Sequence, residues 1–258
     1  MAHQTTQETQ DGHEMRMAFL EHLAELRDRG LRIFVAIFVG TVIGFFFSAQ
    51  AIEVLQEPFC EIAANPADCE FTTLNPTDNI MVFFRVALLL GGILAIPLVT
   101  YQVMAFITPG LTKRERRIVF MSIPAITILF LVGVLFSWFI LIPPALTFLN
   151  GFLPNLFDPE WTADGYLSFT TSLIFWMGVA FETPLVFFVL SVIGMVTPKA
   201  LASNWRIAIV AASIAAAVIT PTIDPVNMFL VMGPLLALYV ISIMLTFVGI
   251  RINQARNK

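Results

Sequence analysis

Long stretches without charged residues constrain this chain more than any other feature. They are Ile33–Ile52, Val86–Thr112, Ile118–Phe157, Tyr166–Phe181 continuing past Glu182 to Pro198, Ile207–Ile223 and Pro225–Ile250. No water satisfies the backbone inside a bilayer, so such stretches cross it as helices of about 20 residues. The sequence therefore predicts an all-α integral membrane protein with six transmembrane helices, over roughly 31–51, 79–107, 116–149, 165–194, 205–220 and 226–249.

Composition supports a single membrane unit. The chain is 58% hydrophobic and 12% charged, whereas a soluble domain carries about 25% charged residues. We expect residues 15–258 to form one six-helix membrane domain and residues 1–14 to be a disordered acidic tail. The polar start lacks the features of a cleavable secretory signal, so the first helix is expected to act as its own insertion signal.

Three of the predicted helices are expected to be irregular. The third apolar run is too long for one straight span, and Pro143-Pro144 is expected to kink it or to end its regular part. The fifth and sixth helices look short, because the turn from Pro221 to Pro225 follows the fifth at once. Short spans thin the bilayer locally or need a cavity beside them.

The basic residues predict the orientation. Thirteen of the fourteen lysines and arginines precede the first helix, follow the sixth, or lie in the loops between helices two and three and between four and five. The exception, Arg85, lies near the outer end of helix two. The three opposite loops contain acidic residues and no lysine or arginine. By the positive-inside rule both termini are cytoplasmic, and the protein is a multi-pass component of the cell (inner) membrane.

Two cysteines, Cys60 and Cys69, lie in the first outer loop. An oxidising compartment favours a disulfide between them, and the eight intervening residues can close a hairpin. Two free thiols are the alternative. A metal site is disfavoured, because no histidine lies nearby.

The residues needed for catalysis are missing from the predicted membrane core. All three histidines, His3, His13 and His22, precede the first span, so no histidine ligand, relay or base is available there. The chain has no G-x-x-x-x-G-K-[ST] loop for a nucleotide. We therefore expect neither an enzyme nor a cofactor or metal.

Two acidic residues on the cytoplasmic side have competing interpretations. Met15–Arg32 is typical of an amphipathic helix lying on the membrane surface. Its Glu25 lies four residues before Arg29, so a solvated salt bridge worth a few tenths of a kcal/mol explains it. Glu115 is surrounded by basic neighbours that would neutralise it. From the residues alone, these structural roles are the favoured ones.

Glu182 lies inside an apolar run and is followed by Pro184. A bare carboxylate costs several kcal/mol there, so it must be protonated, paired or facing a wet cavity. Pairing with Arg85 or with a hydroxyl is the structural interpretation. The functional alternative is the ion site of a secondary transporter or a proton-coupled channel.

Six segments in order carry a resemblance to a known family. The stretch from His22 to Arg29 resembles the HLxELRxR signature of TatC proteins. Tyr101–Leu111, followed by Glu115-Arg116-Arg117, is similar to the family's first cytoplasmic loop. Further segments match Pro58-Phe59, Tyr166–Phe169, Phe181–Pro184, and Thr220-Pro221 with Asp224-Pro225. The match covers helix one to helix six.

The resemblance implies a concave, glove-like bundle of six helices. It further implies the core receptor of the twin-arginine translocase, which binds twin-arginine signal peptides of folded proteins. Transport by this family uses the proton-motive force. The implied partners are TatA and often TatB, which are single-span proteins, with self-association in a multi-subunit complex in the lipid bilayer. Nucleic acid is not among them.

The resemblance also implies roles for individual residues. Glu25 and Glu115 match the acids implicated in recognising the arginine pair, and Arg27 and Phe106 match positions tied to activity beside them. Two carboxylates suit two guanidinium groups, because the planar fork binds a carboxylate bidentately. The positions matching partner contact or the cavity are Pro58, Glu182 and Asp224. Glu182 is expected to receive a polar residue of a partner's transmembrane helix.

Overall fold

The structure is a computed structural model that describes residues 2–62, 71–107, 112–152, 161–220 and 224–254, without the side chains of residues 2–20, 22, 62, 107, 114 and 115. These residues are almost entirely helical. The elements are α1 (Ala2–Ile62), α2 (Asp78–Ile107), α3 (Lys113–Met121), α4 (Ile123–Phe136), the π-helical segment η3 (Ser137–Leu141), α5 (Ile142–Asn150), α6 (Ala163–Phe181), α7 (Thr183–Ile193), α8 (Pro198–Ser203), α9 (Trp205–Ile219) and α10 (Pro225–Gln254).

The membrane spans follow the predicted order. Within the described residues, five segments are long and apolar enough to cross a membrane: Leu23–Glu61, Asp78–Phe106, Arg116–Asn150, Ala163–Ile193 and Pro225–Gln254. The shorter apolar helix α9 has 15 residues, which rise about 22 Å against a hydrocarbon core of about 30 Å. The prediction of a short fifth helix is confirmed. The prediction of a short sixth is wrong, because α10 has 30 residues.

The first helix is longer than expected. α1 has 61 residues and is continuous from Ala2, so residues 2–14 are helical rather than a disordered tail. The amphipathic segment Met15–Arg32 is part of this same helix and does not lie as a separate element on the surface. The chain has no proline before Pro58 to interrupt the backbone hydrogen bonds.

Two spans are broken where prolines follow. In the third span, the α-helix changes to the π-helical segment η3 directly before Pro143 and Pro144. This irregularity is expected, because a proline ring removes an amide donor and clashes with the preceding turn. The fourth span breaks at Glu182, between α6 and α7, with Pro184 in the first turn of α7. Both irregularities lie at or next to the sequence features that predicted them.

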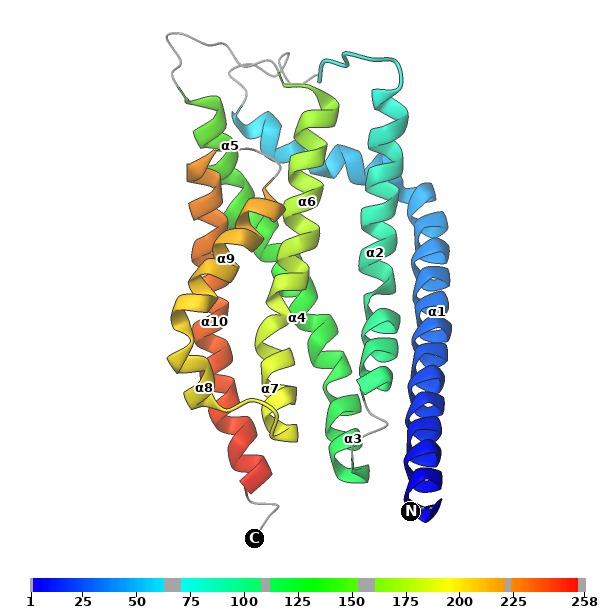
Figure 1. Cartoon of the computed structure of the whole chain (residues 1–258). Coiled ribbons are helices and arrows are strands. Elements are labelled where there is room, and N and C mark those ends of the chain that lie inside the picture. Colours follow the sequence, from blue (N-terminus) through cyan, green and yellow to red (C-terminus); the bar gives the residue numbers. More distant parts are fainter. Residues whose placement is uncertain (1, 63–70, 108–111, 153–160, 221–223, 255–258) are drawn as a thin grey trace.

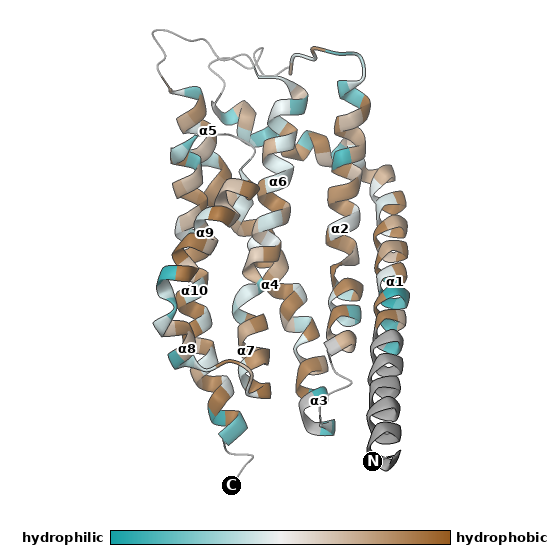
Figure 2. Ribbon diagram, viewed as in Figure 1, coloured by the Kyte–Doolittle hydropathy of each residue, from teal (hydrophilic) through white to brown (hydrophobic). Residues whose placement is uncertain are grey.

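The helices form a bundle with two different ends (Figure 1). The start of α1, α3 and the end of α10 lie at one end, called the terminal end from here on. The start of α2, the end of α5 and the start of α6 lie at the other, called the opposite end. The last part of α1 lies across this opposite end. Figure 2 shows that the long helices between the two ends are predominantly hydrophobic. A glove-like concave face remains a prediction.

Glycines bring α1 and α2 into close contact. A Cβ on Gly40 would lie 2.6 Å from the carbonyl oxygen of Gly91, and one on Gly44 would lie 2.6 Å from that of Ala87. Small residues of this kind let two membrane helices approach closely, which strengthens their van der Waals contacts. The contact fixes the crossing point of α1 and α2 near the middle of the first span.

An aromatic cluster closes the opposite end. The rings of Phe59 on α1, Phe71 and Trp161 each lie 4.9–6.1 Å from the ring of Tyr166 on α6, and Phe59 lies 4.8 Å from Phe71 and 6.0 Å from Trp161, centre to centre. Tyr166 is fully buried and donates from its hydroxyl to the carbonyl oxygen of Leu55 at 2.7 Å. The end of α1, the segment before α2 and the start of α6 are thereby held together at this end.

Candidate functional site

Glu25 lies on α1 in the part that forms the terminal end. Arg29, one turn later, donates from Nε to its Oε1 at 2.9 Å and from Nη2 to the same oxygen at 2.5 Å. The Glu25 side chain is 31% exposed and that of Arg29 is 18% exposed. Glu25 is therefore held in one orientation by its own helix while remaining open to solvent on one side.

The same arginine links α1 to the end of α2. Arg29 donates from Nη1 to Oε1 of Gln102 at 3.3 Å, and Gln102 is itself buried. Phe106, one turn further along α2, is half-buried. The structure thus brings the α1 carboxylate and the end of α2 together through Arg29. The sequence predicted no role for Gln102, which lies within the Tyr101–Leu111 segment; the four-residue spacing of Glu25 and Arg29 was the available signal.

Arg27 lies on the exposed side of α1. It donates from Nη2 to Oδ1 of Asp28 at 2.8 Å, and the Arg27 side chain is 72% exposed. An ion pair this exposed contributes little to stability. Arg27 therefore adds an exposed positive charge to this part of α1 rather than a fixed contact with Glu25.

Glu115 is placed by its backbone alone, since its side chain is outside the described set. It lies in α3, and α3 lies at the terminal end with the first half of α1 (Figure 1). The two predicted carboxylate positions, 90 residues apart in the sequence, therefore lie toward the same end of the bundle, because Arg29 next to Glu25 contacts the end of α2 and α3 follows α2 in the chain. An arrangement on opposite ends would have excluded their joint action on one short peptide.

Glu182 occupies the break between α6 and α7. Its Oε1 is buried and has no hydrogen-bond partner in the part of the chain that the structure describes. Its backbone carbonyl accepts from the amides of Leu185 and Val186 at 3.0 Å each. The break thus keeps its backbone bonds while leaving an acidic oxygen unsatisfied among apolar neighbours such as Phe181.

The proposed pairing of Glu182 with Arg85 is wrong. Arg85 donates from Nη1 to Oδ1 of Asp164 at 2.6 Å, which joins the outer part of α2 to the start of α6. Asp164 lies in the first turn of α6, where its carboxylate also suits the positive end of the helix dipole. The arginine therefore has a nearer acid at the opposite end.

The other two predicted partner positions have structural roles. Asp224 precedes α10 and accepts from the Asn227 amide at 2.7 Å and from its Nδ2 at 3.0 Å, as an N-cap residue does, with Pro225 at the first helical position. Pro58 is buried in the last turn and a half of α1, directly before Phe59 of the aromatic cluster.

Cys60 is bonded in a disulfide. Cys69 lies outside the described residues, so the pairing of these two cysteines remains a prediction. Within the described residues, no group of three histidine, cysteine, aspartate or glutamate side chains is arranged to hold a metal ion.

Comparison with known proteins identifies the family. The family model for Sec-independent protein translocase protein (TatC) matches residues 21–234, which is most of the chain. The chain belongs to the TatC family. A TatC protein of Koribacter versatilis is 38% identical over 232 residues, covering 90% of this chain and 85% of that protein. A TatC protein of Aquifex aeolicus is 38% identical over 231 residues, covering 89% and 94%.

Solved TatC structures share the fold. One, described as the twin-arginine translocase receptor TatC, superposes with a TM-score of 0.79 at 36% identity, covering 88% of this chain and 99% of that one. A second TatC structure, in DDM, gives a TM-score of 0.78 at 38% identity, covering 87% and 98%. The predicted family and the all-α membrane fold are thereby confirmed.

Proposed function

We propose that this chain is the receptor component of a Sec-independent, twin-arginine protein translocase. It binds twin-arginine signal peptides of folded proteins at the terminal end of the bundle. The observation that carries the proposal is the match to the solved twin-arginine translocase receptor over 88% of the chain. The bond from Arg29 to Gln102 supports the same assignment, because it ties the helix turn of Glu25 to the end of α2, which α3 follows in the chain.

Glu25 is the better defined of the two carboxylates. Two nitrogens of Arg29 donate to one oxygen of Glu25, Oε1, so the pair is an existing guanidinium–carboxylate contact. An arginine of the signal peptide would exchange with Arg29 and make the same charge-assisted bonds. Arg29 would then remain tied to α2 through Gln102 and keep α1 in position.

Glu115, Arg27 and Phe106 complete the proposed site. Glu115 in α3 would accept the second arginine of the peptide. The basic residues around it and the exposed Arg27 would repel cations that do not offer a bidentate fork. Phe106, one turn beyond Gln102 on α2, would offer the peptide an apolar surface.

The test is site-specific crosslinking of a twin-arginine peptide to the full-length chain in membranes. Glu25→Ala combined with Glu115→Ala should lower the crosslinking at least tenfold while the protein remains inserted. Glu21→Ala is the matched control, since Glu21 is an exposed carboxylate one turn earlier on α1. Undiminished crosslinking in the double variant, or an equal loss in Glu21→Ala, contradicts the site.

We further propose that Glu182 contacts single-span partners of the TatA and TatB type, and that Pro58 and Asp224 take part in partner contacts elsewhere on the bundle. The unsatisfied Oε1 of Glu182 would accept a hydrogen bond from a polar residue of a partner helix, worth about 0.6–2 kcal/mol in hydrocarbon. The complex would use the proton-motive force and contain several copies of its subunits. Crosslinks from position 182 that never capture a single-span protein would count against this.

The same oxygen favours one alternative, a secondary transporter or proton-coupled channel with Glu182 as its ion site. An acid without a partner at a broken helix is the arrangement that such sites use. Purified chain alone in liposomes distinguishes the two. Proton or solute flux that disappears in Glu182→Gln would favour the alternative, and the receptor predicts none.

The terminal end is proposed to be cytoplasmic, in the cell membrane. Thirteen of the fourteen basic residues lie before the first span, after the last, or in the loops joining spans two to three and four to five, and the positive-inside rule then gives cytoplasmic termini. Labelling of single cysteines placed at residues 27 and 251 from the outside of intact cells should fail.

A further inference from the structure

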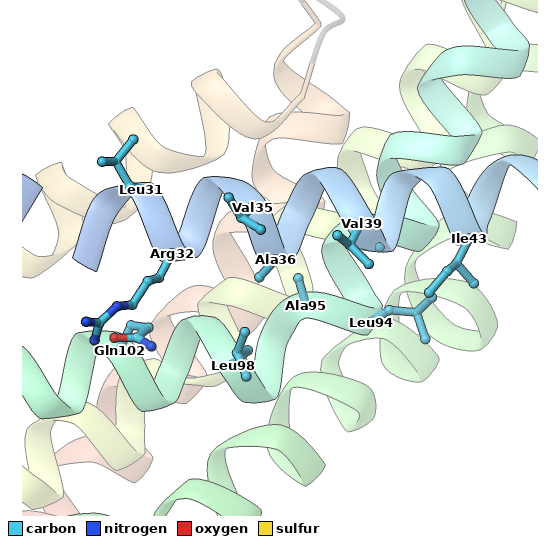
Figure 3. Close-up of a pocket in the computed structure, with 11 residues that line it drawn as sticks. Leu31, Arg32, Val35, Ala36, Val39, Ile43, Leu94, Ala95, Leu98 and Gln102 are labelled. Atoms are coloured by element: carbon cyan, nitrogen blue, oxygen red, sulfur yellow. The ribbon is translucent and has the colours of Figure 1, made fainter. Parts of the chain in front are cut away.

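A groove of about 670 Å³ lies between α1 and α2. Its walls are aliphatic, with Leu31, Val35, Val39 and Ile43 from α1 and Leu94 and Leu98 from α2. Arg32 and Gln102 stand together at one end of it, and Ile43 and Leu94 at the other (Figure 3). The groove is therefore apolar along its length and polar at its terminal end.

The packing of α1 on α2 closes the groove at the other end. The glycine contacts hold the two backbones together at Gly40–Gly91 and at Gly44–Ala87, where no other chain fits between them. On the terminal side of this contact the groove opens, and Arg29 bonds to Gln102 across the two helices. An occupant can enter from the terminal end or from the bilayer, but cannot continue past the middle of the span.

The length of the groove matches one leaflet. Eleven residues separate Arg32 from Ile43, a helical rise of about 16 Å, and half of a hydrocarbon core of about 30 Å is about 15 Å. A partner transmembrane helix would need a groove through both leaflets. An acyl chain needs only the leaflet that its own headgroup faces.

Arg32 provides the charge that a phosphate needs. Its side chain is exposed and forms no ion pair or hydrogen bond with the residues that the structure describes, unlike Arg27, Arg29 and Arg85. A guanidinium binds phosphate oxygens bidentately, and each basic residue near an anionic membrane surface contributes about 1 kcal/mol to that attraction.

We propose that this groove binds one anionic phospholipid from the leaflet at the terminal end. The phosphate lies on Arg32, and one acyl chain lies between Val35, Val39 and Leu98 as far as the glycine contact. The lipid fills the space between α1 and α2 directly beside the Arg29–Gln102 bond. The proposal does not depend on the signal-peptide site.

Native mass spectrometry of the purified full-length chain tests the headgroup contact. Phosphatidylglycerol and phosphatidylcholine are added separately at equal concentrations. Wild type should retain phosphatidylglycerol preferentially, and Arg32→Gln should lower its retention about fivefold, as expected for the loss of about 1 kcal/mol. Arg251→Gln removes an exposed charge at the same end of the bundle and should leave retention unchanged.

A second variant tests the groove itself. Ala36→Phe fills the groove without changing any charge, since Ala36 lines it, and should lower phosphatidylglycerol retention as Arg32→Gln does. Wild-type retention in Arg32→Gln, or equal losses in Arg32→Gln and Arg251→Gln, would overturn the proposal. So would an Ala36→Phe variant that keeps its lipid but loses crosslinks to a partner helix or to a second copy of the chain, because the groove would then hold protein.

Discussion

The two ends of the bundle are held together by different interactions. At the opposite end, the aromatic cluster, the Tyr166–Leu55 hydrogen bond and the Arg85–Asp164 ion pair join α1, α2 and α6. A short backbone bridge between Thr72 and Trp161 adds to them. At the terminal end, a side-chain bond from Arg29 to Gln102 links α1 and α2, and a groove lies between the helices beside it.

Because of this difference, the opposite end is suited to holding the helices in place and the terminal end is suited to binding a ligand. Buried rings and backbone acceptors cannot be exchanged for those of a ligand, so the opposite end fixes the helices relative to one another. Guanidinium–carboxylate bonds near solvent can be exchanged, because a ligand's arginine offers the same geometry as Arg29. Substitutions at the opposite end should therefore alter stability, and those at the terminal end should alter binding.

Tyr166→Ala should have the largest effect on stability. It removes a fully buried ring from the aromatic cluster and should lower the free energy of unfolding by about 3 kcal/mol or more, mainly through lost packing. Tyr166→Phe is the matched control, which removes only the hydroxyl bonded to Leu55 and should cost about 1 kcal/mol. Thermal unfolding of the two variants in detergent measures both, and equal losses would show that the ring packing contributes nothing.

Gly91→Val should have the next largest effect and should act on the boundary between the ends. A Cβ at Gly91 would lie 2.4 Å from the backbone nitrogen of Thr41, so α1 and α2 must separate, at a cost of about 1–3 kcal/mol. Gly233→Val is the control, because a Cβ there meets nothing within 4 Å. Crosslinking between cysteines introduced on α1 and α2 measures the separation of the two helices. An unchanged crosslinking pattern in Gly91→Val would contradict the close contact.

The Arg85–Asp164 pair should contribute less. Its side chains are 30% and 42% exposed, so solvent screens the attraction, and a double-mutant cycle with Arg85→Ala and Asp164→Ala should give a coupling of about 0.5–1 kcal/mol. The coupling should fall when salt is added. A coupling of zero would show that the opposite end depends on apolar packing alone.

Gln102→Leu should have the smallest effect on stability. It keeps the buried volume and removes the acceptor of Arg29, so we expect a change of about 0.5 kcal/mol or less in the free energy of unfolding. Binding of a twin-arginine peptide should nevertheless weaken, because Arg29 loses its tie to α2. A Gln102→Leu variant that unfolds readily but binds the peptide normally would show that this contact at the terminal end serves stability rather than binding.

Hydropathy and proline positions predicted most of the fold. The six apolar segments, the break before Pro143 and the break at Glu182 follow from local chemistry, since a bilayer requires helices and proline removes a donor. The short helix α8 was not predicted, because Pro198–Ser203 is only six residues long and has no apolar period. α10 is longer than the sequence predicts, because the prolines at 221 and 225 limit the length of α9 but not that of the helix that follows.

The sequence by itself determined the membrane character, the order of the spans and, through its motifs, the family. Tertiary structure alone decided which side chains meet: Arg29 with Gln102 rather than only with Glu25, Arg85 with Asp164 rather than with Glu182, and glycines at the crossing of α1 and α2. An apolar run predicts that a segment enters the bilayer, because hydropathy is a property of each residue taken alone. Pairing depends on the rotation and tilt of whole helices, which their packing against one another sets.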